Sequence, residues 1–128
     1  MTKKVINILI ADDEDLIRNS LSRFIARRGH TVHTAINGVE ALDLLKHKSV
    51  DLIILDLLMP EKNGFDVLKE MEKFLPVIVI SAFSGPLEVD IHSDMYPQVI
   101  GFIKKPFENL QTLVEQVEDK YENYIRKI

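Results

Sequence analysis

The chain has 128 residues and a net charge of −4, and it contains no cysteine. Its length, together with 46% hydrophobic and 28% charged residues, predicts one soluble globular domain spanning residues 1–128. Disulfides and thiolate metal sites are excluded, and we expect a cytoplasmic protein without nucleic-acid binding or membrane insertion, because the chain is acidic and shows neither a signal peptide nor a long apolar run.

Strand and helix patterns alternate along the whole chain. The strand patterns are short, apolar and rich in Ile, Leu and Val, whereas the helix patterns repeat apolar residues every three or four positions. In chain order the predicted elements are strand 5–11, helix 16–28, strand 31–35, helix 39–46, strand 51–55, helix 65–74, strand 77–80, a short helix after Gly85-Pro86, strand 99–103 and helix 107–128. Five strands alternating with five helices predict a doubly wound, flavodoxin-like α/β fold with a parallel sheet in strand order 2-1-3-4-5.

Polar residues stand where four of these strands end. In a doubly wound sheet, ligands bind beyond the carboxyl ends of the strands, so residues at those ends converge. They are Asp12, Asp13, Asp56, Ser81 and the pair Lys104-Lys105. Three carboxylates about 4 Å apart repel by several kcal/mol per pair at an effective dielectric near 20, so we expect a cation among them. Ligation by oxygen alone favours Mg²⁺.

The same residue types suit phosphoryl transfer. A carboxylate such as Asp56 can attack phosphorus and form an aspartyl phosphate. A lysine and a metal ion would neutralise the phosphoryl oxygens, and a hydroxyl would donate a hydrogen bond to one of them. The strand ends therefore predict a phosphoryl-accepting site that uses Mg²⁺.

Two sequence motifs support this prediction. An acidic pair follows the first strand in the segment Ala11-Asp12-Asp13-Glu14, and the third strand runs into Leu55-Asp56-Leu57-Leu58-Met59-Pro60-Glu61-Lys62-Asn63-Gly64. In both motifs, and over nearly all of its length, the chain resembles the receiver domains of response regulators. The resemblance implies a two-component phosphoprotein that takes a phosphoryl group onto Asp56 from a sensor histidine kinase or a phosphotransfer protein. Such a domain catalyses only its own phosphorylation and slow dephosphorylation.

The resemblance also assigns roles at the other strand ends. Ser81 would bind the phosphoryl group, and Lys105, followed by Pro106 through a cis peptide bond, would be the site lysine in preference to Lys104. Ser81 and Phe102 would form the conformational switch. Because Phe102 lacks a hydroxyl group, the change at this ring would be transmitted by side-chain packing and not by a hydrogen bond from the ring. A homodimer through the fourth helix, the fifth strand and the last helix would be a further consequence.

The metal site follows from the same resemblance. The carboxylates of Asp13 and Asp56 and the backbone carbonyl of Leu58 would bind Mg²⁺, and Asp12 would act through water. Bulky apolar residues stand two positions after the acceptor and two after the serine, namely Leu58 and Phe83. We expect them to hinder an attacking water, so that the phosphoryl group is lost slowly.

Several of these residues also have a plainer interpretation. An aspartate at a strand end, such as Asp12 or Asp13, is often only a helix cap, and Phe102 suits a core position. His30 and His33 are three residues apart on a strand, which puts them on opposite faces and predicts independent surface roles and no shared metal.

Other functions on the same fold fit the sequence less well. A flavodoxin-like cofactor binder needs a phosphate-cradling loop where acidic residues 12–15 stand, and a phosphatase needs a second acid and a substrate cap. The remaining alternative is a receiver-like scaffold that acts by protein–protein interaction without phosphorylation. The short fourth helix, between Gly85-Pro86 and Tyr96-Pro97, predicts an unusual output face in either case.

Overall fold

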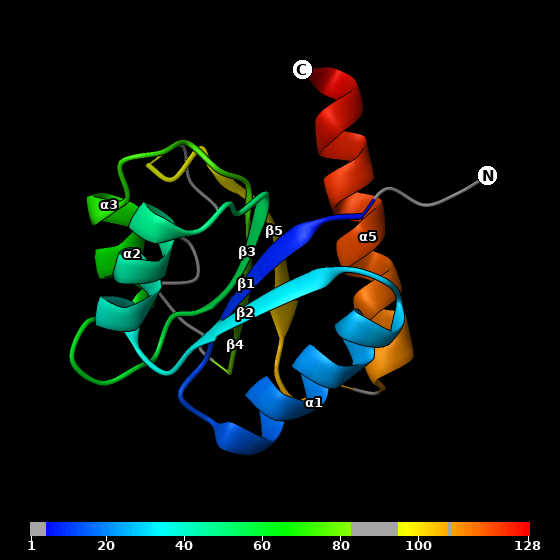
Figure 1. The fold of residues 1–128 in the computed structure, drawn as a ribbon, viewed down its shortest axis with the longest axis horizontal. Coiled ribbons are helices and arrows are strands. Elements are labelled where there is room, and N and C mark those ends of the chain that lie inside the picture. The colour runs from blue at the N-terminus through cyan, green and yellow to red at the C-terminus, as the bar shows by residue number, and fades with distance from the viewer. Residues whose placement is uncertain (1–4, 83–94, 108) are drawn as a thin grey trace.

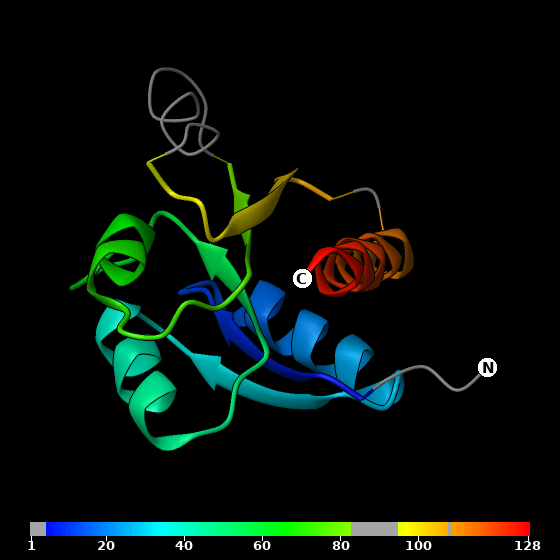
Figure 2. The ribbon, with the colours of Figure 1, turned by 90° about the horizontal axis from the view of Figure 1, so that it is seen from above.

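A computed structural model describes residues 5–82, 95–107 and 109–128. A five-stranded parallel sheet in the order β2-β1-β3-β4-β5 lies between α1 and α5 on one face and α2 and α3 on the other (Figures 1 and 2). The elements are β1 (Asn7–Ala11), α1 (Asp15–Arg27), β2 (Thr31–Ala35), α2 (Gly38–His47), β3 (Leu52–Asp56), α3 (Gly64–Glu70), β4 (Val77–Ser81), β5 (Val99–Lys104) and α5 (Leu110–Lys127). The predicted fold class and strand order are confirmed.

The number of helices agrees with the prediction only in part. The described residues contain four helices, and all four correspond to predicted ones. The predicted short helix after Gly85-Pro86 falls in 83–94, outside the described residues. Within the described part of the chain, no helix is long and apolar enough to cross a membrane.

Two hydrophobic cores lie on opposite faces of the sheet. Every residue of β3 and β4 is buried, as parallel strands covered on both faces require. Alternate residues serve the two cores: Ile53 and Leu55 pack toward α2 and α3, whereas Leu52 and Ile54 pack toward α1 and α5. The sheet is thus a rigid support whose strand ends are fixed in space.

Helix α3 ends four residues earlier than the predicted 65–74. A capping box starts the helix, because Asn63 Oδ1 accepts a hydrogen bond from the Asp66 amide and the Asp66 carboxylate accepts one from the Asn63 amide. At the other end Met71 has an extended backbone, and the side chain of Gln98 donates a hydrogen bond to the carbonyl oxygen of Leu68 at 3.0 Å. A side chain 30 residues away therefore satisfies a carbonyl group that a further helical turn would have used.

The last helix also starts later than predicted. The prediction begins at residue 107, but Asn109 caps the helix by accepting a hydrogen bond from the Thr112 amide at 2.7 Å. The apolar stripe predicted along this helix is confirmed at its centre, where Leu113, Val117 and Tyr121 are buried. The stripe packs helix α5 against the sheet and against α1.

The prediction of a surface role for His30 is wrong. Its side chain is 2% exposed and joins a buried group with Glu118 and Arg28, which we call the Glu118 cluster. His30 Nδ1 accepts a hydrogen bond from the Ile6 amide, so Nε2 carries the hydrogen that is donated to Glu118 at 2.8 Å. Arg28 also donates to Glu118, from the end of α1. The cluster ties α5 to the start of β1 and β2.

Candidate functional site

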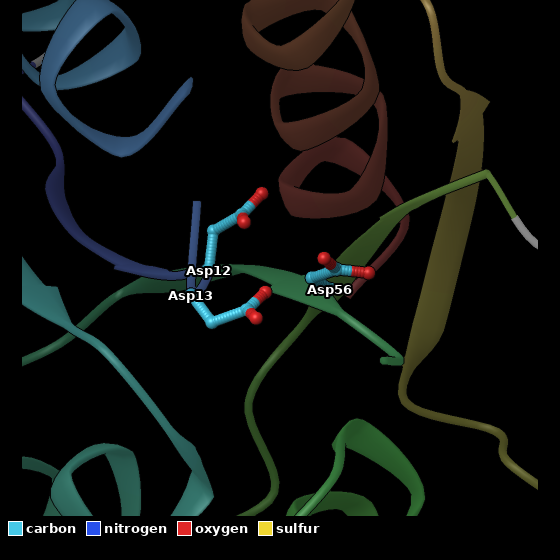
Figure 3. Close-up of side chains that lie close together, drawn as sticks. All are labelled: Asp12, Asp13 and Asp56. Carbon is cyan, nitrogen blue, oxygen red and sulfur yellow. The ribbon is translucent and has the colours of Figure 1, made fainter. Parts of the chain in front are cut away.

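The carboxyl ends of the strands bring the predicted site residues together. Asp12 and Asp13 follow β1, and Asp56 is the last residue of β3 (Figure 3). One carboxylate oxygen of each lies within 4.8 Å of the others. We call these three residues the acid cluster. Asp12 is fully buried and Asp56 is 3% exposed, whereas Asp13 lies on the surface.

The ammonium group of Lys105 lies among these acids. Lys105 Nζ is 2.9 Å from Asp12 Oδ2, 2.7 Å from Glu14 Oε1 and 3.0 Å from Asp56 Oδ2. The Lys105 side chain is 7% exposed, so its contacts with the buried carboxylates of Asp12 and Asp56 are largely shielded from water. The peptide bond between Lys105 and Pro106 is cis, as predicted. Lys105 is therefore the site lysine, whereas Lys104 is exposed.

We expected a divalent ion to offset the repulsion among the acids, but the ammonium group of Lys105 already offsets part of it. Burial favours the neutral form of Lys105, yet its contacts with the carboxylates of Glu14, Asp12 and Asp56 outweigh it and raise the pKa of the lysine above its ordinary 10.5. The ammonium is thus fully charged at neutral pH. It offsets one negative charge in a site that contains several.

The environment of Asp12 still disfavours its charged form, despite the nearby ammonium of Lys105. Burial, with repulsion from Asp56, raises the pKa of Asp12 against the opposing effects of the Glu14 amide and Lys105. One lysine charge shared among three carboxylates does not compensate Asp12 fully. The Lys105 contact to Asp12 Oδ2 is not aligned as a hydrogen bond, and within the described residues this buried oxygen accepts none. An additional cation would satisfy it.

Backbone contacts fix the directions of these acids. Asp12 Oδ1 accepts a hydrogen bond from the Glu14 amide at 2.9 Å, and Asp56 Oδ1 accepts one from the Leu58 amide at 3.2 Å. Arg18, from the first turns of α1, donates to the backbone carbonyl of Asp12 at 3.0 Å. These bonds hold the two buried carboxylates so that their second oxygens face Lys105.

Gly64 permits the close packing of the start of α3 against Asp56. A Cβ atom at this position would lie 2.5 Å from the carbonyl oxygen of Asp56 and 2.7 Å from the Cα of Leu57. Such distances are impossible without a shift of the backbone. The start of α3 can therefore approach the end of β3 only because residue 64 is glycine.

The acid cluster fits a hard divalent cation. Its donors are all carboxylate oxygens, they lie within 4.8 Å of one another, and one of them is a buried oxygen that lacks a hydrogen bond within the described chain. Mg²⁺ binds such donor sets and retains several waters, for which exposed Asp13 leaves an open side. Asp12, Asp13 and Asp56 are thus the side chains that would hold it, and the part predicted for the Leu58 carbonyl stays a prediction.

The two predicted switch residues lie near this edge of the sheet. Ser81 is fully buried at the end of β4, and its carbonyl oxygen accepts a hydrogen bond from the Lys105 amide at 3.0 Å. Phe102, on β5, is partly buried against the core that faces α2 and α3. Their positions suit a switch, but their roles stay predictions.

Sequence reasoning overlooked the contributions of Glu14 and Arg18 to the site. Glu14 was noted only as the residue after the acidic pair, and Arg18 was counted as part of a helix. Both contacts depend on how the β1–α1 connection folds back on the site. Helical spacing could have indicated Arg18, because it stands three positions after Asp15, with which it forms an ion pair at 2.5 Å.

Comparison with known proteins decides the family. The family model of the response regulator receiver domain matches residues 8–118. The chain belongs to this family. Over 120 residues it is 37% identical to the response regulator RR06 of Streptococcus pneumoniae, a match that covers 92% of this chain and 54% of RR06. The chain thus spans about half the length of this curated relative.

Solved structures of receiver domains agree with this assignment. The response regulator TrrA of Thermotoga maritima, solved in complex with Mg²⁺ and BeF, is 32% identical, with a TM-score of 0.74 over 91% of this chain and 99% of that one. A CheY-like receiver domain protein from Methanospirillum hungatei is 20% identical, with a TM-score of 0.85 over 98% and 100% of the two chains, and shows the same fold. Receiver domains work in two-component systems with sensor histidine kinases or phosphotransfer proteins, and phosphorylation and Mg²⁺ binding are typical of them.

Proposed function

We propose that this receiver domain accepts a phosphoryl group on Asp56 in a Mg²⁺-dependent reaction and relays the signal by a conformational switch. The observation that supports this most directly is the position of the Asp56 carboxylate, which is almost completely buried, lies within the acid cluster and is 3.0 Å from the Lys105 ammonium. An unpaired acid at such a position would be costly, so a catalytic or binding role explains its presence.

The chemistry requires one bond to form and one to break. An oxygen of Asp56 attacks the phosphorus of a phosphohistidine, the P–N bond breaks, and the imidazole leaves with the bonding electrons and takes up a proton. Lys105 is close enough to donate a hydrogen bond to an oxygen of the incoming group. Mg²⁺, when bound by the acid cluster, supplies positive charge that offsets the carboxylates and the phosphoryl oxygens.

The signal would follow from rearrangement around the new phosphoryl group. In this proposal the hydroxyl of Ser81 and the ammonium of Lys105 bind phosphoryl oxygens, and Phe102 turns inward and shifts the equilibrium at the β5–α5 face. A sensor kinase or phosphotransfer protein is the donor, and no other substrate is processed. Dimerisation through β5 and α5 is the proposed output, and the predicted fourth-helix contribution lies outside the described residues.

Incubation with acetyl phosphate and Mg²⁺, followed by intact-mass analysis, tests the proposal. The wild-type protein is expected to gain one phosphoryl group, and Asp56→Asn is expected to abolish the gain because the amide is not a nucleophile. Asp43→Asn is the matched control, since Asp43 is an exposed aspartate on α2. A wild-type mass that stays unchanged with Mg²⁺ would favour the alternative, a scaffold that acts without phosphorylation.

The phosphorylated protein is expected to lose the group slowly. Leu58 is 52% exposed next to Asp56, where a polar side chain could orient an attacking water. We therefore expect Leu58→Asn combined with Phe83→Glu to shorten the half-life of the aspartyl phosphate about tenfold, which corresponds to about 1.4 kcal/mol of barrier. Half-lives are measured by intact mass after donor removal, with exposed Leu16→Asn as control. An unchanged half-life in the double variant would contradict the explanation.

A further inference from the structure

Glu14 contacts the site lysine but does not belong to the acid cluster. Its Oε1 accepts a hydrogen bond from Lys105 Nζ at 2.7 Å, and the two residues are 91 positions apart in the sequence. This is the shortest of the three contacts that the ammonium makes with carboxylates. Any effect of Glu14 on the site therefore acts through its contact with the Lys105 ammonium.

Three carboxylates already compete for the ammonium in this state: Glu14 and Asp56 accept hydrogen bonds from it, and Asp12 Oδ2 forms an ion pair with it. A lysine ammonium carries three N–H groups, and carboxylate oxygens of Asp12, Glu14 and Asp56 all lie within 3.0 Å of Nζ. A phosphoryl oxygen on Asp56 would be a fourth acceptor. Because three carboxylate oxygens already lie within 3.0 Å of Nζ, Lys105 binds a phosphoryl oxygen best if one of these contacts lengthens.

The three contacts differ in what their loss would cost. Asp12 is fully buried, and its Oδ2 accepts no hydrogen bond within the described chain, so without Lys105 a buried charge would lack compensation. Asp56 would itself carry the new group. The Glu14 side chain is 56% exposed, so water can replace the ammonium there at little cost. Glu14 is the partner most readily released.

We propose that Glu14 is a positioning residue that competes with the phosphoryl group for Lys105. It holds the ammonium in the unphosphorylated protein and releases it when Asp56 carries a phosphoryl group. This inference rests on the proposed phosphorylation of Asp56. Its consequence is that removal of the Glu14 carboxylate makes Lys105 more available, so the protein binds a phosphoryl-like group at Asp56 more tightly.

Affinity for beryllofluoride, a phosphoryl mimic that binds carboxylates, tests the inference at equilibrium. With Mg²⁺ at saturation, Glu14→Gln is expected to bind beryllofluoride about twofold to fivefold more tightly than wild type in calorimetric titration, the range that an exposed ion pair spans. Asp15→Asn is the matched control. Asp15 is the next acid along the chain and is 81% exposed, but it pairs with Arg18.

A second measurement needs neither metal nor mimic. In the metal-free protein, ¹⁵N NMR of Lys105 Nζ is expected to show faster hydrogen exchange in Glu14→Gln than in wild type or Asp15→Asn. Equal exchange rates would overturn the inference, since they would mean that Glu14 does not restrain the ammonium.

The titrations separate two kinds of failure. If wild type binds beryllofluoride and Glu14→Gln binds it no more tightly, the role of Glu14 is wrong and the proposed function stands. An equal gain in Asp15→Asn would also overturn that role, because the gain would then be a general effect of negative charge. If wild type binds no beryllofluoride, the proposed function fails and the inference about Glu14 fails with it.

Discussion

Replacement of Lys105 by methionine is expected to destabilise the metal-free protein by about 3 kcal/mol, the usual effect of removing one partner from a buried ion pair. The ammonium is 7% exposed and contacts Asp12 and Asp56, both almost completely buried. Methionine fills similar space without the charge, so the two carboxylates would face each other uncompensated. Urea denaturation followed by circular dichroism measures the free energy of unfolding.

The raised pKa of Lys105 determines the pH range in which urea denaturation reports the full contribution of the ammonium. Its folded-state pKa lies above the ordinary 10.5, so the stability that the ammonium contributes is complete below that pH and is lost only as the pH rises through the folded-state pKa. Denaturation at pH 7 therefore reports the full effect. The neighbouring exposed lysine gives the matched control, Lys104→Met, which we expect to change the free energy of unfolding by less than about 0.5 kcal/mol.

Mg²⁺ should distinguish this electrostatic explanation from simple loss of packing. A cation bound by Asp12, Asp13 and Asp56 would compensate the same carboxylates, so Mg²⁺ is expected to raise the free energy of unfolding of Lys105→Met more than that of wild type. If Mg²⁺ stabilises the two proteins equally, the loss in the variant does not come from uncompensated acids.

The positions of the main site residues could be predicted because they depend on strand ends. A parallel sheet brings the carboxyl ends of its strands to one edge, so Asp12, Asp13, Asp56 and Lys105 had to converge once the strands were identified. The apolar runs of β3 and β4 identify those strands reliably, since they are buried on both faces.

The features that could not be predicted depend on side chains distant in sequence. Helix α3 stops early because Gln98 satisfies the Leu68 carbonyl, and no local pattern near residue 70 shows this. The contact of Glu14 with Lys105 likewise depends on the folded connection after β1. His30 was expected on the surface because its spacing to His33 argued only against a shared metal and gave no sign of a buried acid on another element.

Substitution of that buried acid, Glu118, is expected to have the second large effect on the free energy of unfolding. Glu118→Gln should lower the free energy of unfolding by about 2–3 kcal/mol, because the amide leaves Arg28 without its charged partner and turns an N–H group toward Arg28 or His30. The loss should fall toward the lower end of the range for buried pairs, since Arg28 is 27% exposed and can reach water. Urea denaturation at pH 7 measures it.

The control for this variant lies on the same helix. Asp119→Asn removes a carboxylate from the exposed face of α5 and is expected to change stability by less than about 0.5 kcal/mol. A similar small change in Glu118→Gln would mean that helix α5 is held by its apolar stripe alone. A large loss would mean that α5 also depends on a charged contact with the start of β2, at the opposite end of that strand from the acid cluster.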